Sequence, residues 1–241
     1  MPAVVCLPYR GEFGHEVMWH APSVHALQPK DGGQVIVCCQ LGNGALYPSA
    51  DIIVPVQIKP DAKRREQLGQ SEMKWLENIK QRLAKRWSGA DFRFPSPSYP
   101  RRCFIPEPTE PCTIDADIVI CPRKREYGSR KNWKLWPYVA HCLVKNYRVF
   151  ATGRKESSFD DMPCSTAWEY EHPLDATISA MLQAKCVVTT DNGLALLATL
   201  CGRPVFMVSS DRGNTAPGYT GIRMDRYNRL NHLQSKFSVV Y

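Results

Sequence analysis

The chain has 241 residues, of which 44% are hydrophobic and 22% are charged. This composition predicts a globular fold and excludes a disordered chain. The formal net charge of +8 favours anionic partners, among them a nucleotide diphosphate, an acidic glycan or nucleic acid. The sequence has no run of about 18 apolar residues and no basic segment leading into an apolar core at its start, so we expect a cytoplasmic protein without a membrane span.

Ten cysteines are scattered along the chain. They form no Cys-x-x-Cys pair and have no nearby histidines at zinc-ligand spacing. Several of them, such as Cys6, Cys38, Cys142 and Cys186, fall in predicted strands or helices. We interpret the cysteines as small buried hydrophobic residues in a reducing compartment, and we predict no metal site.

Apolar strands alternate with helical segments through the first part of the chain. We predict strands over 4–8, 34–39 and 51–56, and helices over 16–27 and 61–87. The longest helix has apolar residues three or four apart, at Leu76, Ile79, Leu83 and Trp87, with charges between them. This alternation is typical of a mostly parallel sheet with helices on both faces.

A proline-rich stretch, FRFPSPSYPRRCFIPEPTEP, runs from Phe92 to Pro111. Repeated prolines remove backbone donors and favour extended or turn conformations, so we interpret this stretch as a linker. The sequence therefore predicts two Rossmann-like domains, 1–110 and 111–241, which face a central cleft.

The second series contains predicted strands at 117–121, 148–152 and 186–190 and helices at 136–145 and 174–183. It ends in VVTTDNGLALLATLCGRPVFMVS, from Val187 to Ser209, which has the pattern of a strand, a polar turn, a helix and a further strand. Backbone N–H groups at the start of a helix are unpaired and lie at the positive end of its dipole. The turn thus suits a phosphate or a polar sugar, although an ordinary βαβ unit with a polar turn has the same pattern.

A basic loop follows the predicted strand 117–121 directly. Six cations fall within twelve residues: Arg123, Lys124, Arg125, Arg130, Lys131 and Lys134. The loop is either a solvated surface or part of an anion-binding edge of the sheet. With Tyr127, Trp133 and Trp136 it also suits nucleic-acid binding by phosphate contacts and base stacking, although aromatic residues at this spacing more often belong to a core.

The segments DIVICPR, KNWKLWP, YRVFATGRKES and LDATISAMLQAKCVVTTDNGLALLATLCGRPVFMVS occur in this order between Asp117 and Ser209. In this order the chain resembles the C-terminal half of the ADP-heptosyltransferase-like glycosyltransferases. Its GEFGHEVMWHAPSVHAL segment is similar to that family's first turn and helix, while residues 40–110 show no match. The resemblance implies an α/β, GT-B-like fold and transfer of a sugar from a nucleotide-sugar donor to a hydroxyl acceptor. It also implies inversion, with neither a metal nor a further cofactor.

The resemblance also assigns roles to residues. Glu16 matches the family's acid before the proline, so it would be the general base; Glu12 is the alternative, and a purely helix-stabilising role for Glu16 carries equal weight. Asp191 would bind sugar hydroxyls, where a family histidine is replaced by Leu196, a change that leaves the donor sugar open. The remaining donor-side residues would be Lys131 or Lys134 at the diphosphate, assisted by Ser129 and Arg130, and the amides of Asn192, Gly193 and Leu194. Glu156 would hold the nucleoside, with a capping or surface role as the alternative.

Three alternatives remain at this point. The first is a glycosyltransferase that modifies hydroxylated DNA bases, which would have to reach or flip a base. The second is a module that binds a nucleotide or glycan without catalysis, and the third is a sugar-nucleotide epimerase of related architecture. An acid at Glu16 favours a transferase, because a binding module has no need of a base there.

Overall fold

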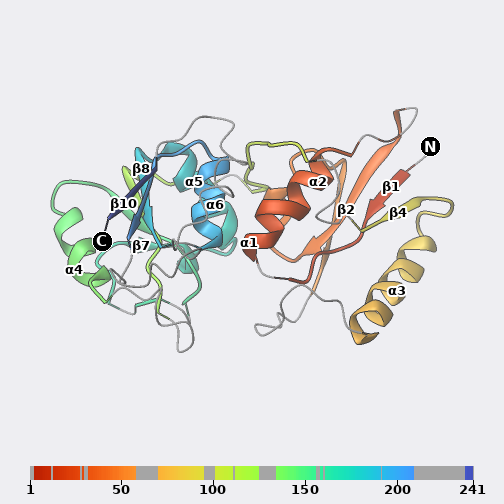
Figure 1. Ribbon diagram of the computed structural model, residues 1–241, viewed down its shortest axis with the longest axis horizontal. Coiled ribbons are helices and arrows are strands. Elements are labelled where there is room, and N and C mark those ends of the chain that lie inside the picture. The colour runs from red at the N-terminus through yellow and green to blue at the C-terminus, as the bar shows by residue number, and fades with distance from the viewer. Residues whose placement is uncertain are drawn as a thin grey trace, which may run out of the picture. The chain divides into compact units, whose positions relative to one another are not determined.

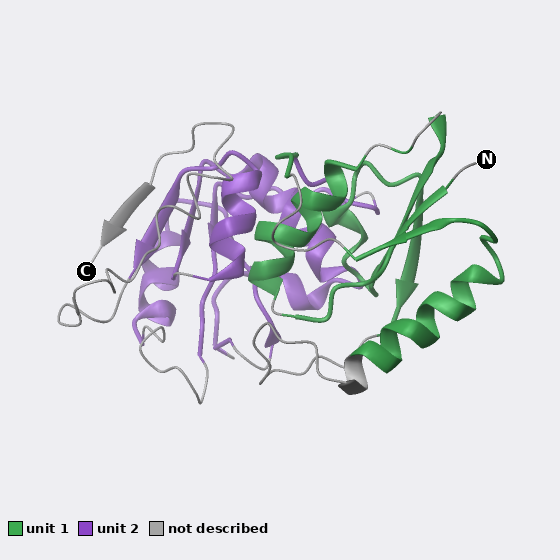
Figure 2. Ribbon diagram, turned by 45° about the vertical axis from the view of Figure 1, so that its right-hand side comes forward, with its two compact units in different colours: residues 1–104 green, residues 105–241 purple. Residues whose placement is uncertain are grey.

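The computed structural model describes residues 3–11, 13–27, 29, 32–57, 70–94, 101–110, 112–124, 134–155, 158–159, 161–190, 192–208 and 237–240. The chain divides into two compact units, Met1–Phe104 and Ile105–Tyr241 (Figure 2). The division falls inside the proline-rich stretch. Within the described residues, no helix has the length and apolar character needed to cross a membrane.

Unit 1 contains a four-stranded sheet in the order β3-β2-β1-β4, in which every pairing is parallel (Figure 1). Its strands are β1 (Ala3–Cys6), β2 (Gln34–Gln40), β3 (Ile52–Val56) and β4 (Asp91–Arg93). The last strand corrects the expected start of the linker, because Phe92 pairs with Val5 of β1. A strand of three residues is too short to leave a period-two pattern in the sequence.

The helical segment after β1 has three consecutive parts: α1 (Phe13–His15), the π-helical η1 (Glu16–His20) and α2 (Ala21–His25). The wide turn closes with a hydrogen bond from the Ala21 N–H to the Glu16 carbonyl, five residues back. Pro22 follows directly; it has no N–H, and a proline ring displaces the carbonyl four residues before it. The proline accounts for the wider turn, a feature that is frequent at functional sites.

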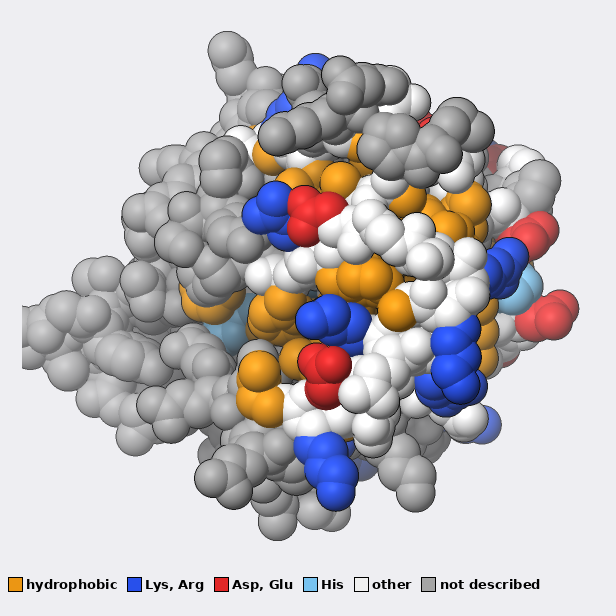
Figure 3. All heavy atoms as spheres, turned by 90° about the vertical axis from the view of Figure 1, so that its right-hand side faces the viewer, with side chains coloured by type: hydrophobic (Ala, Val, Ile, Leu, Met, Phe, Trp, Pro, Cys, Tyr) orange, Lys and Arg blue, Asp and Glu red, His pale blue; other side chains and the backbone are white. Residues whose placement is uncertain are grey.

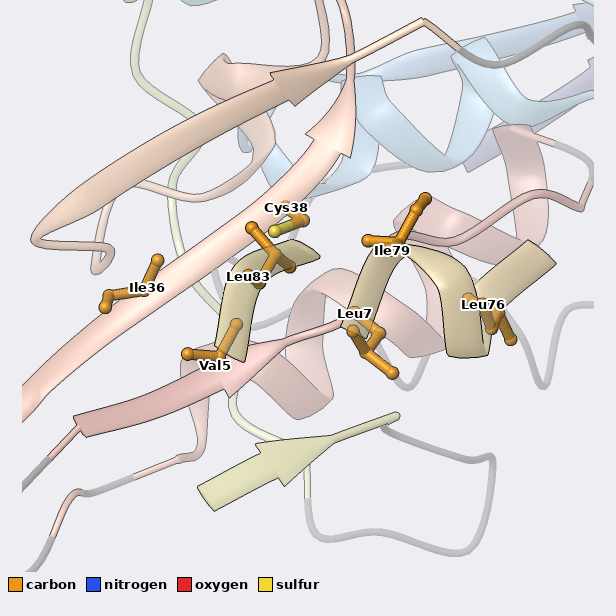
Figure 4. Packing of buried hydrophobic residues seen from close by; sticks show 7 residues of the cluster. All are labelled: Val5, Leu7, Ile36, Cys38, Leu76, Ile79 and Leu83. Atoms are coloured by element: carbon orange, nitrogen blue, oxygen red, sulfur yellow. The ribbon is translucent and has the colours of Figure 1, made fainter. Parts of the chain in front are cut away.

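The helix α3 (Gln70–Ala84) covers one face of this sheet. Its residues Leu76, Ile79 and Leu83 are three or four apart. They pack against side chains of β1 and β2 and of the residue after β1, which Figure 4 shows: Val5, Ile36, Cys38 and Leu7. Burying a side chain of this size contributes about 1.5–3 kcal/mol. The amphipathic pattern therefore predicted the correct face of α3, whereas the expected start of the helix near residue 61 lies outside the described residues.

Unit 2 contains a six-stranded parallel sheet in the order β10-β9-β8-β5-β6-β7. Counted from β5, this is the 3-2-1-4-5-6 order of a Rossmann sheet. The strands are β5 (Ile118–Ile120), β6 (Val149–Ala151), β7 (Ser165–Thr166), β8 (Cys186–Thr189), β9 (Val205–Val208) and β10 (Phe237–Val240). The α/β fold class expected from the alternating pattern is confirmed in both units.

The helices of unit 2 are α4 (Trp136–Leu143), α5 (Pro173–Gln183) and α6 (Gly193–Leu200), with a short 3-10 helix, η6, at Ala167–Glu169. The Trp136 side chain is fully buried and packs with Ile118, Ala140 and Val149. A buried indole ring cannot stack on a base, so a nucleic-acid role for Trp136 is wrong, and the residue belongs to the core.

The cysteines are free thiols, and five of them, Cys6, Cys38, Cys39, Cys121 and Cys201, are buried. Burial raises the pKa of each of these five thiols to about 12. A thiol with so high a pKa stays protonated and unreactive at neutral pH. The interpretation as small hydrophobic residues is confirmed for these five, whereas Cys142 is exposed.

Candidate active site

Each sheet has one point at which the strand order reverses. In unit 1 it lies between β1 and β4, and in unit 2 between β5 and β8. In open parallel α/β sheets, ligands bind outside the carboxyl ends of the strands at such a point. The segments that follow β1 and β8 are therefore the places to look for functional side chains, and both were singled out by the sequence.

Glu16 lies in the helical segment after β1, and its side chain is only 3% exposed. The Tyr47 hydroxyl donates a hydrogen bond to Glu16 Oε1 at 2.7 Å, and Asn43 Nδ2 donates to Oε2 at 2.8 Å. Both donors come from the turn after β2, where Gly42 has a φ of +87°, a backbone conformation that favours glycine. Both carboxylate oxygens are thus held by the neighbouring strand's turn.

The electrostatic surroundings of Glu16 suit a group that exchanges protons near neutrality. Burial raises the pKa of Glu16 from 4.5 to about 7, and the hydrogen bonds from Tyr47 and Asn43 oppose that rise. A general base works best when its pKa lies near the working pH, because it is then both available as the ionised form and basic enough.

His20 extends the same polar group by one helical turn. It is 1% exposed, and its Nδ1 lies 3.0 Å from the Tyr47 hydroxyl oxygen. The rings of Tyr9 and Phe94 lie near it, with centroids 5.4 and 6.0 Å from the imidazole. Burial lowers the pKa of His20 to about 4, with the Leu7 backbone offsetting part of the change. His20 is therefore neutral at pH 7.

Tyr47, Asn43 and His20 were not among the predicted site residues. For His20 a signal existed, because residues four apart on a helix lie on one face and Glu16 is four residues earlier. For Tyr47 no such signal exists, since a loop residue of another strand is brought near Glu16 only by the pairing of β2 with β1. Glu12, the alternative base, lies outside the described residues.

In unit 2, Asn192 is the N-cap of α6. Its Oδ1 accepts hydrogen bonds from the backbone N–H groups of Leu194 at 2.8 Å and Ala195 at 3.1 Å. The Leu194 amide, which we expected to face a phosphate or sugar, is therefore engaged by the cap. Its role toward a phosphate or sugar stays a prediction, and the positive end of the α6 dipole lies at the end of β8.

Hydroxyl groups gather at the carboxyl ends of the neighbouring strands. Asn192 Nδ2 donates to the hydroxyl oxygens of Thr189 and Thr190 at 3.2 and 3.3 Å. After β6, the hydroxyl of the buried Thr152 is hydrogen-bonded to that of Thr177, on α5. These threonines hold the strand ends and the helix starts together, which fixes the shape of the candidate donor edge in unit 2.

Of the other predicted site residues, the structure describes some and leaves others outside its described part. Lys134 is exposed and lies two residues before α4, and Gly193 is the first residue of α6. Leu196 is 5% exposed, so its side chain belongs to the core of unit 2. The remaining residues lie outside the described part of the chain and stay predictions: Ser129, Arg130, Lys131, Glu156 and Asp191.

In the described part of the chain, two cavities lie beside α3. The first has a volume of about 320 Å³ and is lined by Pro55, Val56, Gln57, Trp75, Ile79 and Arg82; the second has about 220 Å³ and is lined mainly by apolar residues that include Leu7 and Phe92. Figure 3 shows Lys and Arg side chains next to hydrophobic ones on the side of unit 1 where α3 lies in Figure 1. None of the predicted site residues lines either cavity, so volume alone does not identify the site.

No protein-family model and no curated protein matches the sequence. Solved structures do match it along its whole length. The glycosyl transferase family 9 protein of Veillonella parvula has a TM-score of 0.58 at 12% identity, covering 99% of this chain and 85% of that one. The E. coli ADP-heptose LPS heptosyltransferase II has a TM-score of 0.53 at 15% identity, covering 100% and 90%.

The E. coli heptosyltransferase WaaC, solved with ADP, has a TM-score of 0.51 at 15% identity and covers 100% of this chain and 94% of its own. At such identities the likeness concerns the fold. Two parallel sheets, one with the Rossmann strand order, agree with it. The chain has a GT-B-like α/β fold, the fold of the heptosyltransferases and glycosyltransferases that it matches.

Proposed function

We propose that the protein is a glycosyltransferase that moves a sugar from a nucleotide-sugar donor to a hydroxyl acceptor. The observation that carries this proposal is the likeness to glycosyltransferases over essentially the full chain. Because a fold alone does not determine function, the chemistry of the two strand-end sites has to support it. We assign the donor to unit 2 and the acceptor to unit 1.

The donor site that we propose lies in unit 2. Its Rossmann strand order places the end of β8 and the start of α6 beside the point where the order reverses. A helix dipole and hydroxyl-rich strand ends suit a diphosphate and a sugar. The matched heptosyltransferase was solved with ADP, so an adenine nucleotide is the first donor class to test. Asp191 and the basic residues Arg130, Lys131 and Lys134 are the proposed polar contacts.

At the acceptor site, Glu16 is the proposed general base. As the acceptor oxygen attacks the anomeric carbon, its proton passes to the Glu16 carboxylate, the bond from that carbon to the diphosphate breaks, and the nucleoside diphosphate leaves with the bonding electron pair. Attack opposite the leaving group inverts the anomeric carbon and requires no metal. Among the described residues, each Glu16 oxygen accepts one hydrogen bond. A carboxylate oxygen has two acceptor sites, so a site remains for the acceptor hydroxyl.

The test combines ligand binding with product analysis. Nucleotides and nucleotide sugars are first screened for a rise in melting temperature, and those that bind are incubated with mixed hydroxyl acceptors and followed by mass spectrometry. We expect released nucleotide and a glycosylated acceptor. Glu16→Gln should lower turnover at least about 100-fold, as expected for loss of a general base, whereas Glu77→Gln, which changes an exposed glutamate on α3, should leave it unchanged.

Each other outcome has a distinct meaning. Full turnover by Glu16→Gln would remove Glu16 from the role of base while leaving the transferase intact. An isomerised donor without transfer would replace the transferase with an epimerase. Tight donor binding with no product from any acceptor would favour the non-catalytic module.

A further inference from the structure

Three buried side chains of unit 1 form a continuous hydrogen-bonded chain. Glu16 Oε1 accepts from the Tyr47 hydroxyl at 2.7 Å, and that hydroxyl oxygen lies 3.0 Å from His20 Nδ1. Tyr47 is 3% exposed, like Glu16, and His20 is less exposed still. Buried polar groups joined in this way constrain one another, because each leaves its neighbour few other partners.

The direction of these hydrogen bonds follows from the number of protons available. An ionised carboxylate only accepts, so the single Tyr47 proton points to Glu16. The Tyr47 oxygen then accepts from His20, which requires the imidazole tautomer with its proton on Nδ1. If His20 instead carried its proton on the other nitrogen, Nδ1 would compete with Glu16 for the Tyr47 proton. A neutral imidazole has one N–H, and the Leu7 backbone carbonyl also accepts from His20, so the two acceptors draw on the same proton. The tautomer of His20 therefore decides where the Tyr47 hydroxyl points.

We propose that Tyr47 and His20 are positioning residues for Glu16: the Nδ1–H of His20 orients the Tyr47 hydroxyl, and this hydroxyl holds the Glu16 carboxylate ready to accept a proton. The inference rests on the proposed function, since it concerns the same base. Neither positioning residue takes up the acceptor's proton. Their effect is to stabilise the ionised form of Glu16 against the burial that disfavours it.

Among the described residues, the other groups that interact with Glu16 or Tyr47 do not titrate in the same pH range. Asn43, on the second carboxylate oxygen, is neutral at all pH values. Cys39 on β2 interacts with Glu16, and Cys6 on β1 interacts with Tyr47, but burial raises the pKa of both thiols to about 12. Tyr47 itself has a pKa well above its ordinary value because of its burial and the nearby Glu16. Near neutral pH, a change in protonation within this group is therefore a change at Glu16.

The first test is the pH profile of the transfer reaction. Tyr47→Phe keeps the ring but removes the donor, so the pKa of Glu16 should rise and the acidic limb of kcat/KM should move upward by about one pH unit, a tenfold change in the ionised fraction. KM for the donor should stay within about twofold. Tyr138→Phe makes the same chemical change on an exposed side chain of α4, 68% accessible, and should leave the profile unchanged.

His20 provides a pair of variants that separates positioning from packing. The amide nitrogen of an asparagine can replace Nδ1–H as a donor, whereas a leucine fills space without donating. His20→Asn should therefore keep the acidic limb near its original pH, and His20→Leu should move it upward like Tyr47→Phe. Equal profiles for the two His20 variants would overturn the role of His20.

The second test does not need turnover. The carboxyl carbon of Glu16 is titrated by NMR in glutamate-labelled protein, with its signal assigned by its absence in Glu16→Gln. We expect its midpoint to rise in Tyr47→Phe and in His20→Leu. An unmoved midpoint in a folded Tyr47→Phe would overturn the inference even if Glu16→Gln is inactive. A moved midpoint together with an active Glu16→Gln would keep the network and reject Glu16 as the base.

If Tyr47→Phe does not fold, the two His20 variants supply the same comparison, because they leave the Tyr47 ring in place. The midpoint in His20→Leu must then exceed that in His20→Asn for the inference to stand.

Discussion

Glu16 and His20 are buried one helical turn apart, and their pKa values are shifted in opposite directions. The pKa of Glu16 is raised from 4.5 to about 7, so the stability that its neutral form contributes is fully present below pH 4.5 and is lost as the pH rises through 7. The pKa of His20 is lowered from 6.5 to about 4, so its contribution is fully present above pH 6.5 and is lost as the pH falls through 4.

Between pH 4.5 and 6.5 the two contributions change in opposite directions and should largely cancel in the wild-type protein. Glu16→Gln leaves His20 uncompensated, so its free energy of unfolding should fall as the pH is lowered from 6.5 to 4. His20→Asn leaves Glu16 uncompensated, so its free energy of unfolding should fall as the pH is raised from 4.5 to 7. For Glu16, the rise in pKa from 4.5 to about 7 corresponds to on the order of 3 kcal/mol in the free energy of unfolding.

Urea unfolding at pH values from 4 to 7.5 measures these slopes, with Glu77→Gln as the control because Glu77 is exposed. If the free energy of unfolding changed with pH in the same way in the wild type and in both variants, the opposite pKa shifts of Glu16 and His20 would be contradicted. Burial would then not be the main cause of the two pKa values.

The sequence identified Glu16 but not what holds it. The position was found because an acid in the turn after a strand, six residues before Pro22, matched a family pattern. Its surroundings depend on Asn43 and Tyr47, which approach from the turn after β2. Neither residue belongs to a local periodic pattern, so only the register of two paired strands brings them to Glu16. A network of this kind has no one-dimensional signature.

At the scale of the element, the Asn192 cap determines how α6 begins. The side chain accepts from two helical N–H groups and donates to two threonines at the end of β8. Asn192→Ala should therefore lower the free energy of unfolding by about 1 kcal/mol, the usual value of an N-cap, whereas Asn192→Asp should lose less because aspartate also caps. Denaturant unfolding measures both.

The exposed Asn146 gives a matched control, since its side chain lies on the surface after α4. Asn146→Ala should change the free energy of unfolding by less than about 0.5 kcal/mol. If Asn192→Ala were as mild as this control, the cap would not be a stabilising feature of α6.

The apolar character of each strand decided whether the sequence could predict it. The strands β2, β3, β8 and β9 each have four or more residues, and their apolar runs predicted them to within about two residues. The strands β5 and β6 have only three residues each, but these are apolar and buried, and both strands were predicted. The strand β4 (Asp91–Arg93) begins and ends with a charged residue and β7 (Ser165–Thr166) is polar, so neither leaves an apolar run in the sequence. The π-helical turn at Glu16–His20 was also missed, because a proline inside a helical pattern more often predicts a boundary than a widened turn.

At the scale of the whole molecule, the two units repeat one topological plan. Unit 1 has the strand order 3-2-1-4 when counted from β1, and unit 2 extends the same order by two strands. The alternation of strands and helices predicted this plan, since it follows from apolar periodicity. Which unit binds which substrate does not follow from that plan, because it depends on side chains at the strand ends.

The proposed assignment of the donor to unit 2 and of the acceptor to unit 1 has a direct consequence for nucleotide binding. If the donor nucleotide is held by unit 2 alone, the affinity for ADP should not depend on Glu16, which belongs to unit 1. We expect Glu16→Gln to bind ADP within about twofold of the wild-type Kd by calorimetry. Lys131→Ala should weaken binding by roughly tenfold or more, because a charge-assisted hydrogen bond to phosphate contributes about 1.5–3 kcal/mol.

Lys145→Ala removes an exposed cation near the end of α4 and serves to separate a specific contact from the overall charge of +8. Long-range attraction falls with ionic strength, so in 0.3 M salt the Lys145 variant should match the wild type while the Lys131 variant stays weaker. Equal weakening by both variants would mean that net charge, and not a built diphosphate site, attracts the nucleotide. A loss of ADP affinity in Glu16→Gln would place part of the donor contact in unit 1 and reject the division itself.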